Sequence, residues 1–185
     1  MWGMMKIYTK TGDLGETGLS GGARVCKDSV RIASCGTVDE LNAALGVARA
    51  AGLTPIDDQI VATIQHQLFL LGQEVATPAP KAPPAGRIGT PQIDWLEQTI
   101  DQLDAALPPL DQFILPGGTR AAAALHLARC VCRRGERLVV RLRAEITLST
   151  TPVTYLNRLG DLLFVLARTA NQRAGQSDVP WQKET

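Results

Sequence analysis

The chain has 185 residues and a formal net charge of +1, and 45% of its residues are hydrophobic while 20% are charged. This balance fits one globular domain, expected over 1–185, and the near-neutral charge gives no general attraction to nucleic acid or to a membrane. No apolar run approaches the length of about 18 residues that marks a membrane-spanning helix, and Met1–Met5 is too short for the apolar core of a secretory signal. We therefore expect a cytoplasmic protein that binds neither nucleic acid nor a membrane.

The segment 8–27 reads YTKTGDLGETGLSGGARVCK, which is rich in glycine and predicts neither helix nor strand. It lacks the Walker pattern and the dinucleotide-binding glycine pattern. Backbone N–H groups in such a loop can still form a concavity that binds an anion. Lysine charges and threonine hydroxyls would add to it, from Lys10, Lys27, Thr9, Thr11 and Thr17. The alternative interpretation is a flexible loop without a ligand.

Hydrophobic residues recur at helical spacing through most of the remaining chain. Thr37 followed by Glu40 has the pattern of a capping box, which predicts that the first helix opens there and ends at Gly52. Further helices are expected over the ranges 56–76, 91–107, 118–146 and about 150–174. Evidence for strands is thin throughout.

Five prolines lie between residues 77 and 92, so 77–92 is expected to be a surface loop inside the domain. The stretch 113–120, FILPGGTR, predicts a connector into the fourth helix. The tail 175–185 carries no strong signal. Four or five long antiparallel helices predict an all-α bundle with a glycine-rich N-terminal loop.

The four cysteines do not indicate a metal site. Cys130 and Cys132 are two residues apart, which places them about 200° apart on a helix, on nearly opposite faces. No Cys-x-x-Cys motif and no paired histidines accompany them or Cys26 and Cys35. We expect reduced, structural thiols and no metal held by the protein alone.

The fourth helix carries a charged side. At about 100° per residue, one side holds His126, Arg129, Arg133, Glu136 and Arg137. The other side would be the core stripe, made of Ala124, Val131, Gly135, Leu138, Val139 and Leu142. One interpretation is a solvated face with i,i+3 and i,i+4 pairs. The dominance of arginine favours instead bidentate recognition of phosphate or carboxylate.

The last helix and the first helix add polar groups to this picture. One face of the last helix holds Asn157, Asp161, Phe164 and Arg168. Asn157 is either an ordinary surface amide or part of a site. Asp39 is either an acid near a positive helix end or the partner of an arginine. Taken with the glycine-rich loop, the arginines predict a binding site for a polyphosphate.

Six blocks occur in an order that resembles one known family. They read TKTGDLGET (9–17), RVCK (24–27), GTVDELN (36–42), FILPGGT (113–119), RRGER (133–137) and YLNRL (155–159). Together they are similar to the PduO-type ATP:cob(I)alamin adenosyltransferases. The likeness runs from about residue 6 to 172, and the order of the blocks makes it specific, whereas any single block would be weak.

The resemblance implies a ferritin-like, five-helix antiparallel bundle that forms a homotrimer with active sites between subunits. The residues that it implies for ATP binding are Thr9, Lys10, Thr11, Gly12, Asp13, Thr17, Gly18, Lys27, Arg133, Arg134, Glu136, Arg137 and Asn157. Mg²⁺ is expected on the ATP phosphates. Arg133 is implied as catalytic, together with Asp39 and Arg129, which would pair across the interface. Phe113 would press against the lower face of the corrin of cobalamin.

The implied reaction uses Co(I) of cob(I)alamin as the nucleophile, which attacks C5′ of ATP and releases triphosphate. The resemblance also suggests a cob(II)alamin reductase and a B12-dependent acceptor enzyme as partners. A bundle that binds ATP as a regulator without transferring adenosyl is the main alternative. A helix over 129–143 that binds nucleic acid is a third interpretation, which the lack of stacking aromatics beside the arginines disfavours.

The sequence departs from the family pattern at two positions. Ala33 stands where the family often has glutamate, which puts the role of Arg31 in doubt. Gly135 replaces a commoner alanine inside the arginine block, which costs about 1 kcal/mol of helix propensity and should leave the arginine geometry intact.

Overall fold

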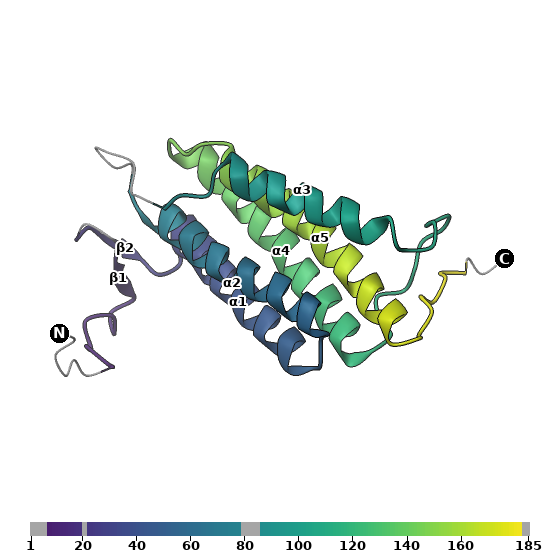
Figure 1. Ribbon diagram of the computed structural model, residues 1–185. Helices are drawn as coiled ribbons and strands as arrows, with labels where there is room; N and C mark the ends of the chain where they lie inside the picture. Colours follow the sequence, from purple (N-terminus) through teal and green to yellow (C-terminus); the bar gives the residue numbers. More distant parts are fainter. Residues whose placement is uncertain (1–6, 20–21, 79–85, 183–185) are drawn as a thin grey trace.

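Five long helices lie side by side in the computed structural model of the chain, which describes residues 7–19, 22–78 and 86–182 (Figure 1). They are α1 (Val30–Ala50), α2 (Pro55–Ala76), α3 (Thr90–Asp104), α4 (Arg120–Glu145) and α5 (Thr151–Arg173). Helix α4 packs between α1 and α5, and it runs antiparallel to both (Figure 1). The expected all-α, five-helix antiparallel bundle is confirmed.

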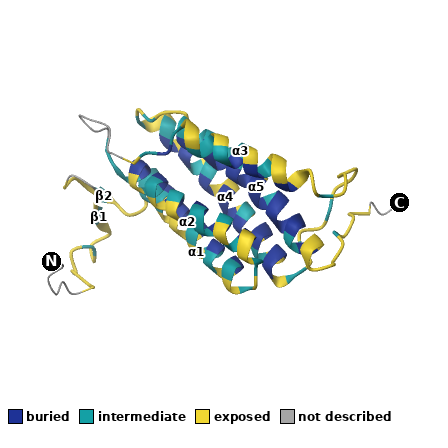
Figure 2. Ribbon diagram, in the orientation of Figure 1, coloured by how far each residue is buried: buried dark blue, intermediate teal, exposed yellow. Residues whose placement is uncertain are grey.

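Leucine and valine side chains from the helices fill one continuous core (Figure 2). Within the predicted core stripe of α4, the fully buried residues are Val131, Gly135, Val139 and Leu142, while Ala124 and Leu138 are half-buried. Cys130 is exposed and Cys132 is buried, so the two thiols face opposite sides of α4 as their spacing predicts. None of the helices in the described part of the chain has both the length and the apolar character needed to cross a membrane.

The first helix begins at Val30, seven residues before the predicted start, so the capping box at Thr37 is wrong. Thr37 lies within α1, where its hydroxyl donates to the carbonyl of Ala33 at 2.8 Å. Its methyl group packs against Gly135 of α4, since a Cβ added to this glycine would lie 3.5 Å from Thr37 Cγ2. The threonine is therefore a buried contact between helices. For the same reason Asp39 is not a first-turn acid, because it follows two complete turns of α1.

The glycine-rich segment contains two short strands that the sequence did not predict. They are β1 (Glu16–Gly18) and β2 (Arg24–Cys26), which pair antiparallel with Thr17 opposite Val25. Three residues per strand are too few to give a clear alternating pattern in the sequence. The hairpin stands away from the helices at the end of the bundle where α1 begins (Figure 1).

The other elements follow the expected ranges closely. Helix α4 begins after Thr119, whose hydroxyl accepts from the backbone N–H of Ala122 at 3.1 Å, and this cap leaves 113–119 as a connector. Helix α3 begins at Thr90, so the last residues of the expected loop 77–92 are helical, with Pro91 in the first turn, where a missing N–H costs nothing. Residues 79–85 of that loop lie outside the described residues.

Helices α1 and α4 run in opposite directions, and this decides where the functional segments lie. The glycine-rich hairpin precedes α1 at one end of the bundle, whereas the connector that carries Phe113 precedes α4 at the other end (Figure 1). Helix α4 has 26 residues, which corresponds to a length of about 39 Å. One copy of the chain therefore holds the hairpin and Phe113 far apart.

Candidate active site

The hairpin places one lysine over its glycine-rich turn. The backbone N–H of Lys27 donates to the carbonyl of Gly15 at 2.8 Å, which fixes the base of the turn. The Lys27 side chain then crosses Gly12, since a Cβ added to Gly12 would lie 3.0 Å from Lys27 Nζ. Arg24 ties the turn to β2, because its guanidinium donates to the carbonyl of Thr11 at 2.7 Å. The absence of a side chain at Gly12 thus lets an ammonium group approach the backbone.

The residues before this turn present hydroxyls and a second lysine to solvent. Lys10 has a positive φ of 60°, which turns the chain so that the hydroxyls of Thr9 and Thr11 lie 2.9 Å apart. Lys10 Nζ lies 5.8 Å from the centroid of the Tyr8 ring. Asp13 and Gly18 are also exposed, whereas Gly12 and Thr17 are half-buried. The implied ATP residues of the loop therefore gather on one small hairpin.

Two large apolar side chains on the same segment are almost fully exposed. Ile7 is 100% exposed and Leu14 is 96% exposed. Aliphatic side chains exposed singly are common on protein surfaces, so these two do not by themselves mark an interface.

The arginine block on α4 is connected to both neighbouring helices. Arg134 forms an ion pair with Glu40 of α1. Glu136 accepts a hydrogen bond from the side-chain amide of Asn157 on α5 at 3.3 Å. Arg133 is exposed, and its side-chain stem lies over Gly160 of α5, where an added Cβ would be 3.8 Å from Arg133 Cγ. The structure thus brings together the predicted site residues of α4 and α5.

Arg158 extends this cluster, although the sequence analysis gave it no role. Its guanidinium donates to Oδ1 of Asn157 at 2.8 Å and to Oε1 of Glu97 on α3 at 2.7 Å. Asn157 is therefore held from two sides, with its amide nitrogen toward α4. The position of Arg158 directly after Asn157 in the YLNRL block was the available signal.

Among residues 7–19, 22–78 and 86–182, no hydrogen bond or ion pair links Arg129 to Asp39. Asp39 is exposed on α1, whereas Arg129 is half-buried on α4. The guanidinium carbon of Arg129 lies 5.7 Å from the centroid of the Phe164 ring, and its Nε is buried without a hydrogen-bond partner among the described residues. The residue as a whole is half-buried, so part of its side chain is open to a group from outside the chain.

His126 belongs to the interior rather than to the exposed charged side. It is 3% exposed, and its ring meets Phe164 edge-on at a centroid distance of 6.0 Å. Burial lowers the pKa of His126, and the positive charge of Arg129 lowers it further, while Asp178 acts in the opposite direction. The imidazole is a packing group beside the arginines.

Phe113 points away from the bundle with 80% of its surface exposed. Its backbone carbonyl accepts from the N–H of Trp181 at 2.7 Å. A shallow cavity of about 510 Å³ lies here, lined by Leu110, Asp111, Gln112, Phe113 and Trp181. Residues 175–182 carry no periodic pattern, so the role of the tail could not be predicted from the sequence.

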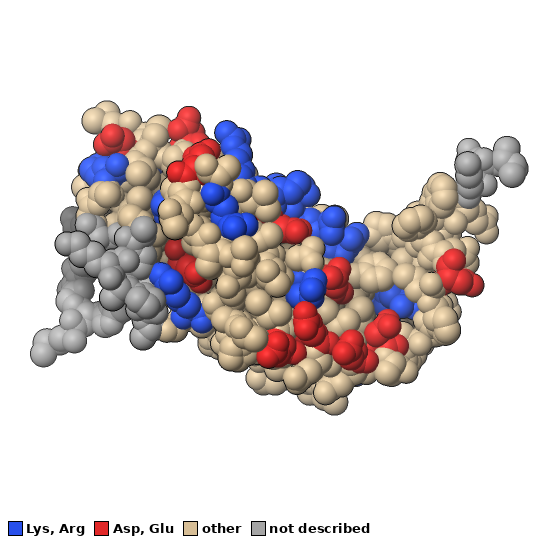
Figure 3. Space-filling model, turned by 90° about the horizontal axis from the view of Figure 1, so that it is seen from above, with Lys and Arg blue, Asp and Glu red and all other residues tan. Residues whose placement is uncertain are grey.

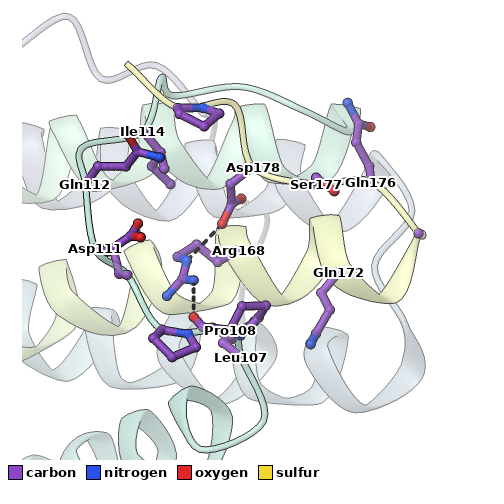
Figure 4. A pocket seen from close by; sticks show the side chains of 14 residues that line it. Leu107, Pro108, Asp111, Gln112, Ile114, Arg168, Gln172, Gln176, Ser177 and Asp178 are labelled. Carbon is purple, nitrogen blue, oxygen red and sulfur yellow. Dashed lines mark hydrogen bonds and ion pairs between the residues drawn. The ribbon is translucent and has the colours of Figure 1, made fainter. Parts of the chain in front are cut away.

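A second cavity of about 480 Å³ lies behind the same connector, between α5 and the tail (Figure 4). Arg168 forms part of its wall, and it is only 4% exposed. The sequence places Arg168 on the polar face with Asn157, but in the structure the tail covers it. Asp178 from the tail accepts from Arg168 Nε at 2.9 Å.

Arg31 has a structural role that the sequence left in doubt. Its guanidinium donates to the carbonyls of Val75 and Thr77 at 2.8 and 3.1 Å, so it satisfies carbonyl groups at the end of α2. Ala33 is exposed.

Charges of both signs are spread over the surface of the bundle. Seen from above, several Asp and Glu side chains gather on one part of the surface, while Lys and Arg side chains lie mainly along the opposite edge, with some acidic groups among them (Figure 3). The net charge of +1 is therefore the sum of local charges of both signs.

The chain is similar to known proteins over nearly its whole length. A family model described as cobalamin adenosyltransferase matches residues 7–170. A cobalamin adenosyltransferase from Cupriavidus metallidurans is 48% identical over 182 residues, which are 98% of this chain and 96% of that protein. A corrinoid adenosyltransferase from Bacillus subtilis is 43% identical over 183 residues, with 97% and 93% of the two chains covered.

Solved structures show the same fold with ligands bound. A variant of the PduO-type ATP:corrinoid adenosyltransferase from Lactobacillus reuteri, complexed with cobalamin and ATP, matches with a TM-score of 0.90 at 37% identity. The match covers 96% of this chain and all 100% of that chain. The present chain therefore belongs to the cobalamin adenosyltransferase family. It is a transferase that moves the adenosyl group of ATP to a corrinoid, as the six blocks predicted.

Proposed function

We propose that the exposed arginines of α4, Arg133 and Arg137, stabilise the triphosphate that leaves ATP during this transfer. The observation that carries the proposal is the exposed Arg133 beside the Asn157–Glu136 hydrogen bond, in a chain of this family. Co(I) of cob(I)alamin supplies the electron pair, the Co–C5′ bond forms, and the bond from C5′ to the triphosphate oxygen breaks. The enzyme then has two tasks, which are to align C5′ with cobalt and to balance charge on the departing triphosphate.

The hairpin binds the ATP phosphates in this proposal. Lys27 over Gly12, exposed Lys10 and the paired hydroxyls of Thr9 and Thr11 supply charge and hydrogen-bond donors at one turn. Mg²⁺ bound with nucleotides takes most of its ligands from phosphate and water. Among the described residues no three His, Cys, Asp or Glu side chains lie close enough to hold an ion. We propose that Mg²⁺ enters with ATP.

We propose a homotrimer with active sites between subunits, and the separation of these parts supports it. The hairpin and Phe113 lie at opposite ends of one bundle, so in this proposal a neighbouring copy brings its hairpin to the arginine face (Figure 1). The exposed Ile7 and Leu14 would then be covered. Asp39 of one copy would meet Arg129 of another, which would give the Arg129 guanidinium a carboxylate partner that the described part of its own chain does not provide.

Phe113 occupies the lower face of the corrin in this proposal. Its exposed ring is apolar and would keep water and the dimethylbenzimidazole ligand from cobalt. A cobalt without a lower ligand is easier to reduce from Co(II), which is the state that a reductase would act on. A cytoplasmic location, a cob(II)alamin reductase and a B12-dependent acceptor enzyme stay predictions.

An anaerobic assay tests the reaction directly. Purified protein is mixed with MgATP and chemically reduced cob(I)alamin, and the absorbance of the cobalt–carbon product is followed together with released triphosphate. We expect adenosylcobalamin and triphosphate in equal amounts. ATP binding without product would contradict the proposal and favour the regulatory alternative.

The interface pair has its own test. Asp39→Arg and Arg129→Asp should each reduce activity, and the double exchange should recover part of it because the charges again attract. Sedimentation of each variant reports the trimer. If the free-energy loss in the double variant equalled the sum of the two single losses, the two charges would not interact, which would contradict the pairing.

A further inference from the structure

The tail of the chain pairs with the connector that carries Phe113. The N–H of Trp181 donates to the carbonyl of Phe113 at 2.7 Å. The N–H of Leu115 donates to the carbonyl of Val179 at 2.8 Å. These two hydrogen bonds form a short antiparallel ladder, so the backbone around Phe113 is held by residues near the end of the chain.

Asp178 begins this part of the tail, and α5 holds both of its carboxylate oxygens. Oδ2 accepts from Arg168 Nε at 2.9 Å, and Oδ1 accepts from Asn171 Nδ2 at 3.2 Å. Arg168 is 4% exposed and Asn171 is 2% exposed, so little water competes for these contacts. Charge-assisted hydrogen bonds of this kind are stronger than neutral ones and fix direction as well.

The same two α5 side chains also bind both ends of the longer segment 108–119, which includes the connector. Arg168 Nη2 donates to the carbonyl of Pro108 at 2.7 Å, on the side of α3 (Figure 4). Asn171 donates to the carbonyl of Gly117 at 3.1 Å, and its Oδ1 accepts from the N–H of Thr119 at 2.9 Å. Arg168 and Asn171 therefore bind both this segment and the tail.

Gly118 shows how closely Asn171 approaches the connector. The glycine has a φ of 106°, and a Cβ added to it would overlap the Asn171 amide. A side chain at this position would force Asn171 from the backbone groups that it binds. The lack of a side chain at Gly118 thus lets the Asn171 amide of α5 reach the backbone of the connector.

Phe113 itself has little packing to set its direction, because 80% of its side chain is exposed. Its position then depends on the backbone, which the tail ladder and the α5 contacts hold. A displacement of about 1 Å in a group that positions substrate can cost about 100-fold in rate.

We propose that Arg168, Asn171 and Asp178 form a latch that positions Phe113 against the lower face of the corrin. They are positioning residues, and their effect on the reaction passes through Phe113. The inference rests on the proposed placement of Phe113 at the corrin. It adds that the tail is required for the cobalt step and is dispensable for ATP binding.

The test compares Asp178→Ala with Phe113→Ala and with the double variant. Cob(II)alamin is bound in the presence of MgATP, and its electron paramagnetic resonance spectrum reports the fraction without a lower ligand. For Asp178→Ala we expect this fraction and kcat to fall by about 10- to 100-fold, while the KM for ATP stays within about twofold. The double variant should be no slower than Phe113→Ala alone, because the latch acts only through that ring.

Hydrogen exchange of the intact protein supplies a measurement that does not depend on activity. In Asp178→Ala the amides of Leu115 and Trp181 should exchange faster, while those of α1 and α4 stay protected. Asp178→Asn keeps the side-chain size and removes the charge, and it serves where the alanine variant is unstable. Asp101→Ala, which removes an exposed acid on α3, is the matched control.

The outcomes separate the latch from the proposed function. Unchanged exchange and an unchanged cobalt spectrum in both Asp178 variants, with a clear loss in Phe113→Ala, would overturn the latch and leave the placement of Phe113 intact. An unchanged spectrum in Phe113→Ala would overturn that placement and with it the role of the latch in the reaction. A double variant much slower than Phe113→Ala would show that Asp178 acts by another route.

Discussion

The side-chain amide of Asn157 on α5 donates a hydrogen bond to Oε1 of Glu136 on α4, at 3.3 Å. Asn157 Oδ1 accepts at the same time from Arg158, at 2.8 Å. The amide is thereby oriented, and it fixes the Glu136 carboxylate next to the arginines that we assign to the triphosphate. The relationship joins two helices at the centre of the proposed nucleotide site.

Asn157→Ala removes this link. We expect a loss of about 1–2 kcal/mol of stability, because the hydrogen bonds with Glu136 and Arg158 both disappear while the two half-buried partners keep access to water. The KM for ATP should rise by about tenfold, which corresponds to about 1.4 kcal/mol of binding. Gln65→Ala is the control, since Gln65 makes a comparable contact between helices with the carbonyl of Asn42 at 3.0 Å. An equal rise in KM in the control would rule out a specific role.

Arg133→Ala tests the charge that faces the leaving group. The side chain is exposed, so the variant should fold and assemble as before, while kcat falls by about 100- to 1,000-fold, as for other groups that stabilise transition-state charge. Arg141→Ala is matched to it, because Arg141 is an exposed arginine of the same helix that pairs with Glu145 at 3.9 Å. Steady-state kinetics with MgATP and cob(I)alamin measure both. Activity of Arg133→Ala near that of Arg141→Ala would remove Arg133 from the site.

Gly12→Ala tests the approach of Lys27 to the loop. The new Cβ would lie 3.0 Å from Lys27 Nζ and 3.3 Å from the backbone carbonyl oxygen of Glu16, so the flexible ammonium group moves away and the backbone adjusts slightly. We expect little change in melting temperature and a KM for ATP raised by about three- to tenfold. In a Lys27→Ala background the same substitution should have almost no further effect. A full additional effect there would show that Gly12 acts independently of Lys27.

Gly135→Ala should stabilise the protein. The added Cβ would make an ordinary contact with Thr37 Cγ2 at 3.5 Å, and alanine favours a helix over glycine by about 1 kcal/mol. Urea denaturation should therefore show a gain of about 0.5–1 kcal/mol with unchanged kcat. Destabilisation would mean that α1 and α4 are too close at this point to accept a methyl group.

His126 should make stability fall in acid. Its pKa in the folded chain is lowered by burial and by Arg129, and the opposing effect of Asp178 is smaller. Above the unfolded-state pKa of about 6.5 the imidazole is neutral in both states, so its titration does not change stability. Below that pH the imidazole is protonated in the unfolded chain but stays neutral in the folded chain. Stability then falls by up to about 1.4 kcal/mol per pH unit until the folded-state pKa is reached.

The measurement is urea denaturation between pH 7.5 and 5, with His126→Leu compared with the wild-type chain. The difference between the two free energies of unfolding should change with pH in that range. His66→Leu, at an exposed position of α2, controls for the loss of the only other imidazole. A constant difference between His126→Leu and the wild-type chain would contradict the prediction.

Local pattern was enough for most of the helices and for part of the site. The expected helix 56–76 is α2 (Pro55–Ala76), and the expected 118–146 is α4 (Arg120–Glu145), because their apolar residues repeat at helical spacing and Thr119 supplies a cap. Arg133 and Arg137 were identified by residue type and face, and both are exposed on α4. The start of α1 was wrong because Thr37 has the chemistry of a cap and is used as a buried contact.

The sequence by itself determined the bundle, the arginine face and the family, since each depends on residues that are near one another along the chain or on ordered blocks. Only the tertiary structure decided that Arg168 and Asn171 bind the connector and the tail. Asn171 and Gly117 are 54 residues apart. No periodic pattern encodes such a pair, because a hydrogen bond between distant residues depends on how the helices pack. Packing also placed the hairpin and Phe113 at opposite ends of the bundle.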